Sequence, residues 1–253
     1  ALGNNSGIRT VDAPGSVIGG LHPGSRNLIS GNRYVGVQLG RDCEVLGNLI
    51  GTDITGQRAL PNAGGVSFYM TDSTVGGVDP AARNIISGNG SVGVTFNVAH
   101  GNRIVGNWIG LDATGTNALG NGWSSGQAGQ GIGIALFLAD DNVIGEAGAG
   151  NIIAGNAWGI DGLGSRNRIQ GNLIGTDFTG TNVLANSAVG IRLGNPAMGT
   201  QIGGAEPGAG NVIAGAQRAI ALLGAGVEGT RVLGNRIGVD ASGVTPMPNG
   251  SGI

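Results

Sequence analysis

Short apolar stretches alternate with glycine and asparagine along the whole chain. None of them keeps the 3.6-residue apolar period of a helix over a helical length, so alternating strands and helices are excluded. The longer alternating strands that flank Asn-Gly or Asp-Gly hairpin turns are missing as well. The remaining pattern predicts a solenoid, in which each short strand stacks in parallel on its equivalent in the next coil.

The apolar pattern belongs to a repeated unit. The segment 47–56 reads Gly-Asn-Leu-Ile-Gly-Thr-Asp-Ile-Thr-Gly and returns at 106–115, at 171–180 and, more loosely, at 234–243. An Ile/Val-Gly-Gly or Ile-Gly-Glu motif recurs between these segments, beginning at Ile18, Val75, Ile144 and Ile202. It is followed each time by Asn-x-Ile-x-Gly-Asn or a close variant, beginning at Asn27, Asn84, Asn151 and Asn211.

This periodicity predicts the fold. We expect residues 1–253 to form a single all-β domain, a right-handed parallel β-helix. Each unit of roughly 60 residues would hold three coils of roughly 20 residues. About 12 coils at about 4.8 Å each would give a solenoid roughly 55–60 Å long.

Residues that stay constant between the units identify the inner face. The stretches 45–46, 104–105, 169–170 and 232–233 begin with Val or Ile, whereas their second member varies. In the next strand an isoleucine is constant at Ile50, Ile109, Ile174 and Ile237. The position before that isoleucine holds Leu49, Trp108, Leu173 and Arg236. Because side chains alternate along a strand, the constant positions should face inward and the variable ones the outer surface.

The recurring asparagines have a mechanical interpretation. Asparagine tolerates the left-handed backbone of a corner, and stacked amides can hydrogen-bond from coil to coil. We expect such structural ladders at Asn48, Asn107, Asn172 and Asn235, and at Asn32, Asn89 and Asn156.

Both ends of the sequence stop at the same phase of the repeat. The opening Ala-Leu-Gly-Asn and the closing Pro-Asn-Gly-Ser-Gly-Ile match the interior segments that begin at 59 and 184. Solenoids blunt their open edges with atypical capping coils. We therefore expect a fragment of a longer array, or a piece that stacks end to end with copies of itself.

Composition narrows the choice of function. There are 55 glycines, only 11% of residues are charged, and all 13 basic residues are arginine. With a net charge of −2 and scattered arginines, we expect no nucleic-acid partner. No apolar run approaches the ~18 residues that span a bilayer, so membrane insertion is not expected. The lone Cys43 excludes an internal disulfide and a cysteine-rich metal site.

The repeat pattern resembles a known family. It reads Gly-Asn-x-Ile-Gly-Thr-Asp-x-Thr-Gly-x-x-Ala-Leu-x-Asn, then Ile-Gly-Gly-x-x-Pro-Gly-x-x-Asn-x-Ile-Ser-Gly-Asn, with the best matches at 47–62, 17–32, 171–186 and 202–215. This pattern is similar to the parallel β-helix repeats of very large secreted bacterial proteins. The resemblance implies an extracellular or cell-surface protein in which such arrays act as stalks or adhesive surfaces. Similar coils occur in polysaccharide-active enzymes, and fold alone does not decide function.

Three aspartates are candidate catalytic residues. Glycosidase or lyase chemistry needs two groups at a fixed separation. Asp140 and Asp141 are adjacent, at a predicted corner where a turn acid is ordinary. Asp161 is the only acid at an outward strand position that holds Gln38, Thr95 and Ala221 elsewhere, and no second group is evident. Solvated surface acids explain all three, so an enzyme is the less favoured interpretation.

The repeated Asp-x-Thr/Ser-Gly motif allows two interpretations. Its acids are Asp53, Asp112, Asp177 and Asp240. Carboxylates that accept backbone N–H groups in their own turn explain the spacing. A weak Ca²⁺ site is the alternative, although each loop offers only one carboxylate. No other cofactor is expected.

Two tryptophans are candidate ligand-binding residues, because aromatic rings can stack on sugars. Trp108 has an outward register, and Trp123 lies in the longest insertion, between Gly120 and Gly131. The sequence therefore predicts an extracellular structural or adhesive β-solenoid whose partners are copies of itself, flanking repeats or surface glycans. The alternative is a carbohydrate-binding or polysaccharide-degrading β-helix.

Overall fold

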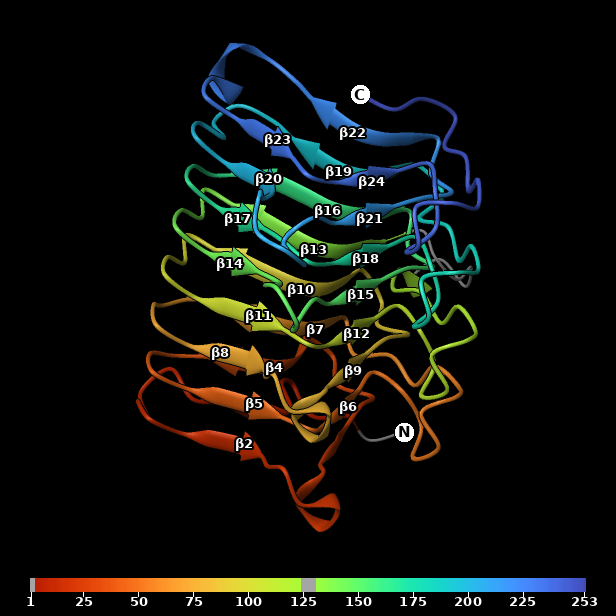
Figure 1. Cartoon of the computed structure of the whole chain (residues 1–253). Coiled ribbons are helices and arrows are strands. Elements are labelled where there is room, and N and C mark those ends of the chain that lie inside the picture. The colour runs from red at the N-terminus through yellow and green to blue at the C-terminus, as the bar shows by residue number, and fades with distance from the viewer. Residues whose placement is uncertain (1–2, 124–130) are drawn as a thin grey trace.

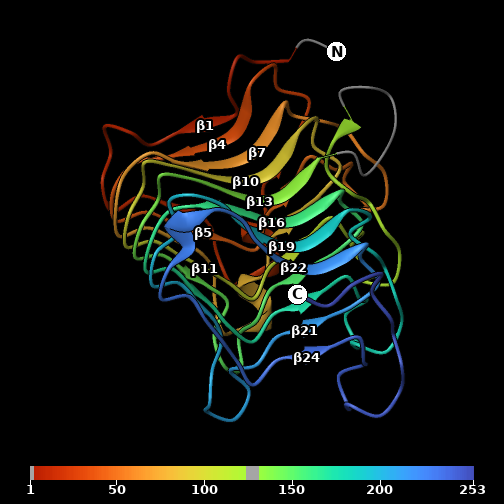
Figure 2. The ribbon, with the colours of Figure 1, turned by 90° about the horizontal axis from the view of Figure 1, so that it is seen from above.

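A computed structural model describes residues 3–123 and 131–253. Three parallel β-sheets run along its long axis (Figure 1). Seen down the stack, the sheets lie on three sides of a common interior (Figure 2). The all-β architecture is confirmed, and the arrangement is consistent with a parallel β-helix. None of the helices in the described ranges is long and apolar enough to cross a membrane.

Each sheet contains eight strands in the described residues. Sheet A consists of β1 (Ile8–Arg9), β4 (Val35–Leu39), β7 (Gly64–Phe68), β10 (Val92–Asn97), β13 (Ile132–Phe137), β16 (Trp158–Leu163), β19 (Val189–Leu193) and β22 (Arg218–Leu222). Sheet B consists of β2 (Val17–Gly19), β5 (Glu44–Leu46), β8 (Thr74–Gly76), β11 (Arg103–Val105), β14 (Val143–Ile144), β17 (Arg168–Ile169), β20 (Gln201–Gly203) and β23 (Arg231–Leu233). Sheet C consists of β3 (Leu28–Ile29), β6 (Leu49–Ile50), β9 (Ile85–Ile86), β12 (Trp108–Ile109), β15 (Ile152–Ile153), β18 (Leu173–Ile174), β21 (Val212–Ile213) and β24 (Arg236–Ile237).

Each strand pairs with the third strand that follows it in the chain, so one layer takes three strands. Ile29 pairs with Ile50, for example, although the two residues belong to different sequence motifs. The expected 12 coils of roughly 20 residues are therefore wrong: the described chain stacks eight strands deep in every sheet. At about 4.8 Å per layer the stack is about 38 Å long, shorter than expected. The Asn-x-Ile and Gly-Asn-x-Ile motifs occupy the same sheet in successive layers, which is why counting each motif as a coil failed.

Loops of two kinds explain why the sequence repeats every second layer. In one layer the loop from sheet B to sheet C is long, and in two cases it carries a 3₁₀ helix, η1 (Pro23–Ser25) or η2 (Pro80–Ala82). In the next layer that corner is tight, and the long loop follows sheet C instead. These second loops are closed by antiparallel bridges such as Thr52 to Ala59. A further 3₁₀ helix, η4 (Ala225–Val227), lies after β22.

The inner faces of all three sheets share one apolar core. Ile50, Ile109 and Ile174 are fully buried in it, as their constancy predicted, and Ile237 in the last strand of sheet C is half-buried. Sheet A adds two stacked rings, Phe68 and Phe96, whose centroids are 4.4 Å apart. Burial of these aliphatic and aromatic groups is the main favourable term in folding.

A second apolar cluster covers the outer face of sheet C, and it corrects one prediction. Leu49 and Trp108 were expected on the surface, yet they are only 2% and 8% exposed. The Asp-x-Thr/Ser-Gly loops fold over this face. Gly115 of one loop lies directly on the Trp108 ring, so a Cβ at Gly115 would come within 2.6 Å of that ring. Some of the outward positions of sheet C are therefore buried between the sheet and a loop that packs on it.

The contact between loop and sheet can be tested with two glycines of equal backbone conformation. Gly115 and Gly15 both have φ near +73°, but nothing lies within 4 Å of a Cβ at Gly15. Both alanine variants take on left-handed strain, of about 1–2 kcal/mol. Gly115→Ala should lose about 1–3 kcal/mol more, because its methyl group meets Trp108. Urea unfolding measures the difference, and equal losses would show that the loop does not pack on the ring.

Candidate functional site

A column of eight asparagines runs along the corner between sheets B and C. Each amide Nδ2 except the last donates to the Oδ1 of the asparagine in the next layer, at 2.8–3.1 Å. The column alternates between the two asparagine motifs, in the order Asn27, Asn48, Asn84, Asn107, Asn151, Asn172, Asn211 and Asn235. The predicted ladder is therefore confirmed, and its members Asn48, Asn107, Asn172 and Asn235 form every second rung.

A second ladder follows the corner between sheets C and A. It includes the predicted residues Asn32, Asn89 and Asn156 and interleaves them with further asparagines that sequence reasoning did not assign. The rungs are Asn4, Asn32, Asn62, Asn89, Asn121, Asn156 and Asn186, joined at 2.7–3.3 Å. The next layer has Ala216 at this place, and its backbone N–H donates to Asn249 instead.

Each inner rung is saturated. The Asn107 amide donates to Asn151 Oδ1 and to the carbonyls of Val75 and Val105, and its Oδ1 accepts from both nitrogens of Asn84. A buried amide without partners would cost roughly 1–3 kcal/mol. A rung is therefore stable only when the layers on both sides are present, which couples each layer to its neighbours.

Replacing one rung with its acid should expose this coupling. Asn107→Asp keeps the shape but replaces the donors with a buried carboxylate facing Asn151 Oδ1. We expect a loss of about 3–5 kcal/mol in the free energy of unfolding at neutral pH, because the charge is uncompensated. Asn235→Asp is the matched control, since Asn235 is part-exposed and contacts one rung only. Equal, small losses in both variants would contradict the interpretation.

The four Asp-x-Thr/Ser-Gly loops hold their aspartates as turn acceptors. Asp112 Oδ1 accepts from the Thr114 hydroxyl at 2.6 Å and from backbone N–H groups, while Oδ2 accepts from Asn117 Nδ2 at 2.9 Å. Asp53, Asp177 and Asp240 accept in the same way from Thr55, Thr179 and Ser242. The loops also join one another, through bonds such as Ala113 N–H to the Gly56 carbonyl at 2.9 Å. No cluster of three or more His, Cys, Asp or Glu suited to a metal ion occurs within 3–123 and 131–253.

These hydrogen bonds change the acidity of the loops. Burial alone would raise the pKa of Asp112, but the bonds from Thr114 and Asn117 outweigh it and hold that pKa below its usual value. The pKa of Asp177 is lowered in the same way, by Asn182 and Thr179. A carboxyl whose pKa is lower in the folded chain adds stability at pH values above its unfolded pKa, near 3.9. That stability is lost as the pH falls through the lowered folded pKa.

Acid unfolding therefore tests the turn interpretation. The free energy of unfolding of the wild type should fall below about pH 4. Asp112→Asn should flatten part of that fall, because the site no longer titrates. Thr114→Ala is the companion variant: it keeps the acid but removes its shortest bond, so it should flatten the fall less. Urea unfolding at pH 7, 4 and 2.5 measures the slopes. Identical slopes in all three proteins would contradict a structural role for the carboxylate.

Asp161 is bound to an arginine that sequence reasoning missed. It lies on the outer face of β16, and Arg192 of β19 is its register partner. The guanidinium binds both carboxylate oxygens, at 2.6 and 2.8 Å, and its central carbon lies 3.9 Å from the centroid of the Trp158 ring. The two residues are 31 apart in the sequence, and only the register of sheet A brings this bidentate pair together.

Asp140 and Asp141 lie elsewhere, at the corner after β13. Asp141 forms a bidentate pair with Arg166 at 2.8 and 2.7 Å, and Asp140 accepts the Ser165 N–H at 2.7 Å. Asp161 pairs in the sheet with Ala135 of β13, and the corner acids Asp140 and Asp141 come five and six residues after Ala135. The structure thus does not bring the three candidate catalytic residues together. Two different arginines neutralise them.

The two candidate tryptophans have different surroundings. Trp108 lies beneath the loops, with the Arg83 guanidinium 4.3 Å and the Phe178 ring centroid 5.9 Å from its ring centroid. Its ring therefore does not form an open platform. Trp123 is half-buried and its backbone N–H donates to Asn89. The rest of its insertion, residues 124–130, lies outside the described residues.

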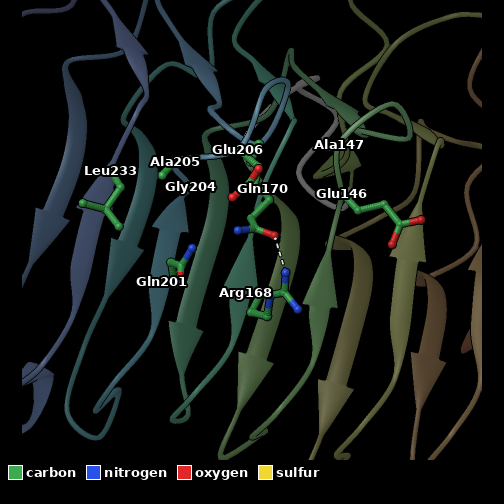
Figure 3. Close-up of a pocket in the computed structure, with 10 residues that line it drawn as sticks. Glu146, Ala147, Arg168, Gln170, Gln201, Gly204, Ala205, Glu206 and Leu233 are labelled. Atoms are coloured by element: carbon green, nitrogen blue, oxygen red, sulfur yellow. Dashed lines mark hydrogen bonds between the residues drawn. The ribbon is translucent and has the colours of Figure 1, made fainter.

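A hollow of about 550 Å³ lies on the outer face of sheet B, between two of the long corner loops. Glu146 and Glu206 line it, but Glu206 lies beside Gln170 near the middle, whereas the Glu146 carboxylate points away from it at one side (Figure 3). Glu146 is paired with Arg103 at 2.7 Å. Arg168 donates to Gln170 at 2.9 Å, and Gln170 donates to the Gly203 carbonyl. Four of the polar side chains that line the hollow, those of Glu146, Arg168, Gln170 and Gln201, are thus bound within the protein.

A groove of about 600 Å³ crosses the outer face of sheet A at its N-terminal end. Two exposed tyrosines, Tyr34 and Tyr69, stand at its sides, and sequence reasoning had not singled them out. The two tyrosines belong to no repeated sequence motif. Only the register of sheet A shows that they line the same groove.

Comparison of the chain with protein-family models, with curated proteins and with solved structures gives no match. The function is therefore inferred from the fold and from the geometry of these sites.

Proposed function

We propose that the chain is a structural or adhesive segment of an extracellular or cell-surface β-solenoid, which extends when a further layer stacks on its end strands. The further layer would come from a second copy of the chain or from a flanking repeat. The solenoid is inferred to be right-handed, since parallel crossovers are right-handed in about 98% of cases. The extracellular setting follows from the resemblance of the repeat to large secreted bacterial proteins.

The single observation behind this proposal is the uniform direction of the asparagine ladder between sheets B and C. At one end, Asn27 Oδ1 accepts no described side chain or backbone group. At the other end, Asn235 Nδ2 donates to the Ile202 carbonyl but to no described Oδ1. One face of the stack thus offers an acceptor and the other a donor. A head-to-tail contact of this kind is heterologous and continues without closing.

The edge of sheet A supports the same direction of growth. Ser251 forms a parallel bridge with Arg218 of β22, and its carbonyl accepts the Ala219 N–H at 2.9 Å. Asn249 meanwhile takes the ladder position beside Ala216. The backbone edge after β22 therefore accepts a further strand in register.

The polysaccharide-degrading alternative has less support. It needs two acid groups at a fixed separation on one surface. The candidate aspartates are separated and paired with arginines, and the groove on sheet A is lined, within the described chain, by neither Asp nor Glu.

Concentration-dependent assembly tests the proposal. Sedimentation and electron microscopy of the purified chain should show rods that lengthen with concentration. Ile237→Lys, which places an inward charge in the last strand of sheet C, should prevent this growth. Ile54→Lys adds the same charge to an exposed loop and should leave assembly unchanged. Single short particles at every concentration, or assembly of Ile237→Lys, would contradict end-to-end stacking.

A further inference from the structure

The groove on sheet A has an ordered floor. Four outward side chains from successive strands form one column along the stack: Arg9, Gln38, Ser67 and Thr95. The strands are about 4.8 Å apart, so the floor presents one polar group per layer. Beyond Thr95 the column continues with Ala135 and then with the closed pair of Asp161 and Arg192, which ends the polar floor.

The polar groups of this floor are uncommitted. Elsewhere the inner asparagines of the ladders and the aspartates of the loops are engaged in internal bonds. In contrast, the side chains of Arg9, Gln38, Ser67 and Thr95 make no hydrogen bond within residues 3–123 and 131–253. Their amide, hydroxyl and guanidinium groups can therefore bind a ligand without breaking internal contacts.

The walls of the groove are aromatic. Tyr34 precedes β4 on one side of the column and is 62% exposed, and Tyr69 follows β7 on the other side and is 42% exposed. Tyrosine rings have apolar faces and a polar hydroxyl at the edge. They suit a ligand that is apolar on its ring faces and polar around its edge. Sugar rings have this character.

We propose that this groove binds a neutral polysaccharide. Tyr34 and Tyr69 would stack on sugar rings, while Gln38, Ser67 and Thr95 would hydrogen-bond hydroxyl groups of successive units. Among the described residues of the lining only Arg9 is charged, so the polar contacts in the other layers come from uncharged amide and hydroxyl groups, which suit a polymer without charged units. Since the described residues of the lining include no carboxylate for acid–base work, we expect the groove to bind the polysaccharide without cleaving it. This inference goes beyond the proposed structural function and names a ligand class for an adhesive face.

Affinity electrophoresis of the full chain tests the proposal, with gels that contain hydroxyethylcellulose, glucomannan, galactomannan or dextran. A gel with polygalacturonate serves as the acidic comparison. We expect retardation by at least one neutral polymer. Tyr34→Ala and Tyr69→Ala should each weaken it by about tenfold, in line with the loss of one stacking partner. Phe137→Ala is the matched control, because Phe137 is 43% exposed but does not line the groove.

Thr95→Val gives a second variant that keeps the shape of the side chain and removes only its hydroxyl, so it should also weaken binding. Circular dichroism melting checks that every variant is folded. The proposal is overturned if no neutral polymer retards the wild type, if polygalacturonate retards it more strongly, or if the tyrosine variants bind as well as the wild type. Rods that assemble but bind no polysaccharide would overturn this inference and leave the proposed structural function intact.

Discussion

The structure depends on the mutual saturation of buried side-chain amides. An asparagine at a solenoid corner is removed from water, and its donors and acceptor must be satisfied within the protein. In this chain they are satisfied mainly by the same residue type one layer away. Because each amide must hydrogen-bond to an asparagine of the adjacent layer, the position of each strand is specified by its neighbours. Aliphatic burial supplies the driving force, but it is non-directional and could not by itself fix the register.

The loops outside the sheets add a further level of organisation. Long loops alternate between two corners, and the aspartate loops fold back over the outer face of sheet C. Gly115 is required in such a loop because it rests on the Trp108 ring. Gly110, in the same unit, has a φ of +89°, and a Cβ there would collide with the Ala154 carbonyl in the next layer. The abundance of glycine thus reflects close approach of the backbone between layers as well as turn geometry.

Much of the fold could be predicted from the sequence, because repetition shows which positions are constrained. Ile50, Ile109 and Ile174 are constant since they fill the core, and the ladder asparagines recur for the same reason. The number of layers could not be predicted, because two similar motifs lie on one sheet and look like separate coils. The burial of Trp108 depends on a loop that folds back on it. Arg192 and Asp161 are remote in sequence, and only the register of sheet A pairs them. Tyr34 and Tyr69 are likewise brought to one groove only by the register of sheet A.

The hydrogen bonds of the ladders can be measured directly. Exchange of the asparagine Nδ2 hydrogens with solvent can be followed residue by residue by NMR spectroscopy on the labelled protein. If the ladders couple the layers, the amides of Asn107 and Asn151 should exchange as slowly as the backbone of the core strands around them. Those of Asn235, in the last rung, should exchange much faster. Rapid exchange of the inner amides alongside a protected backbone would show that the ladder bonds are not formed, and would contradict the central role given to them.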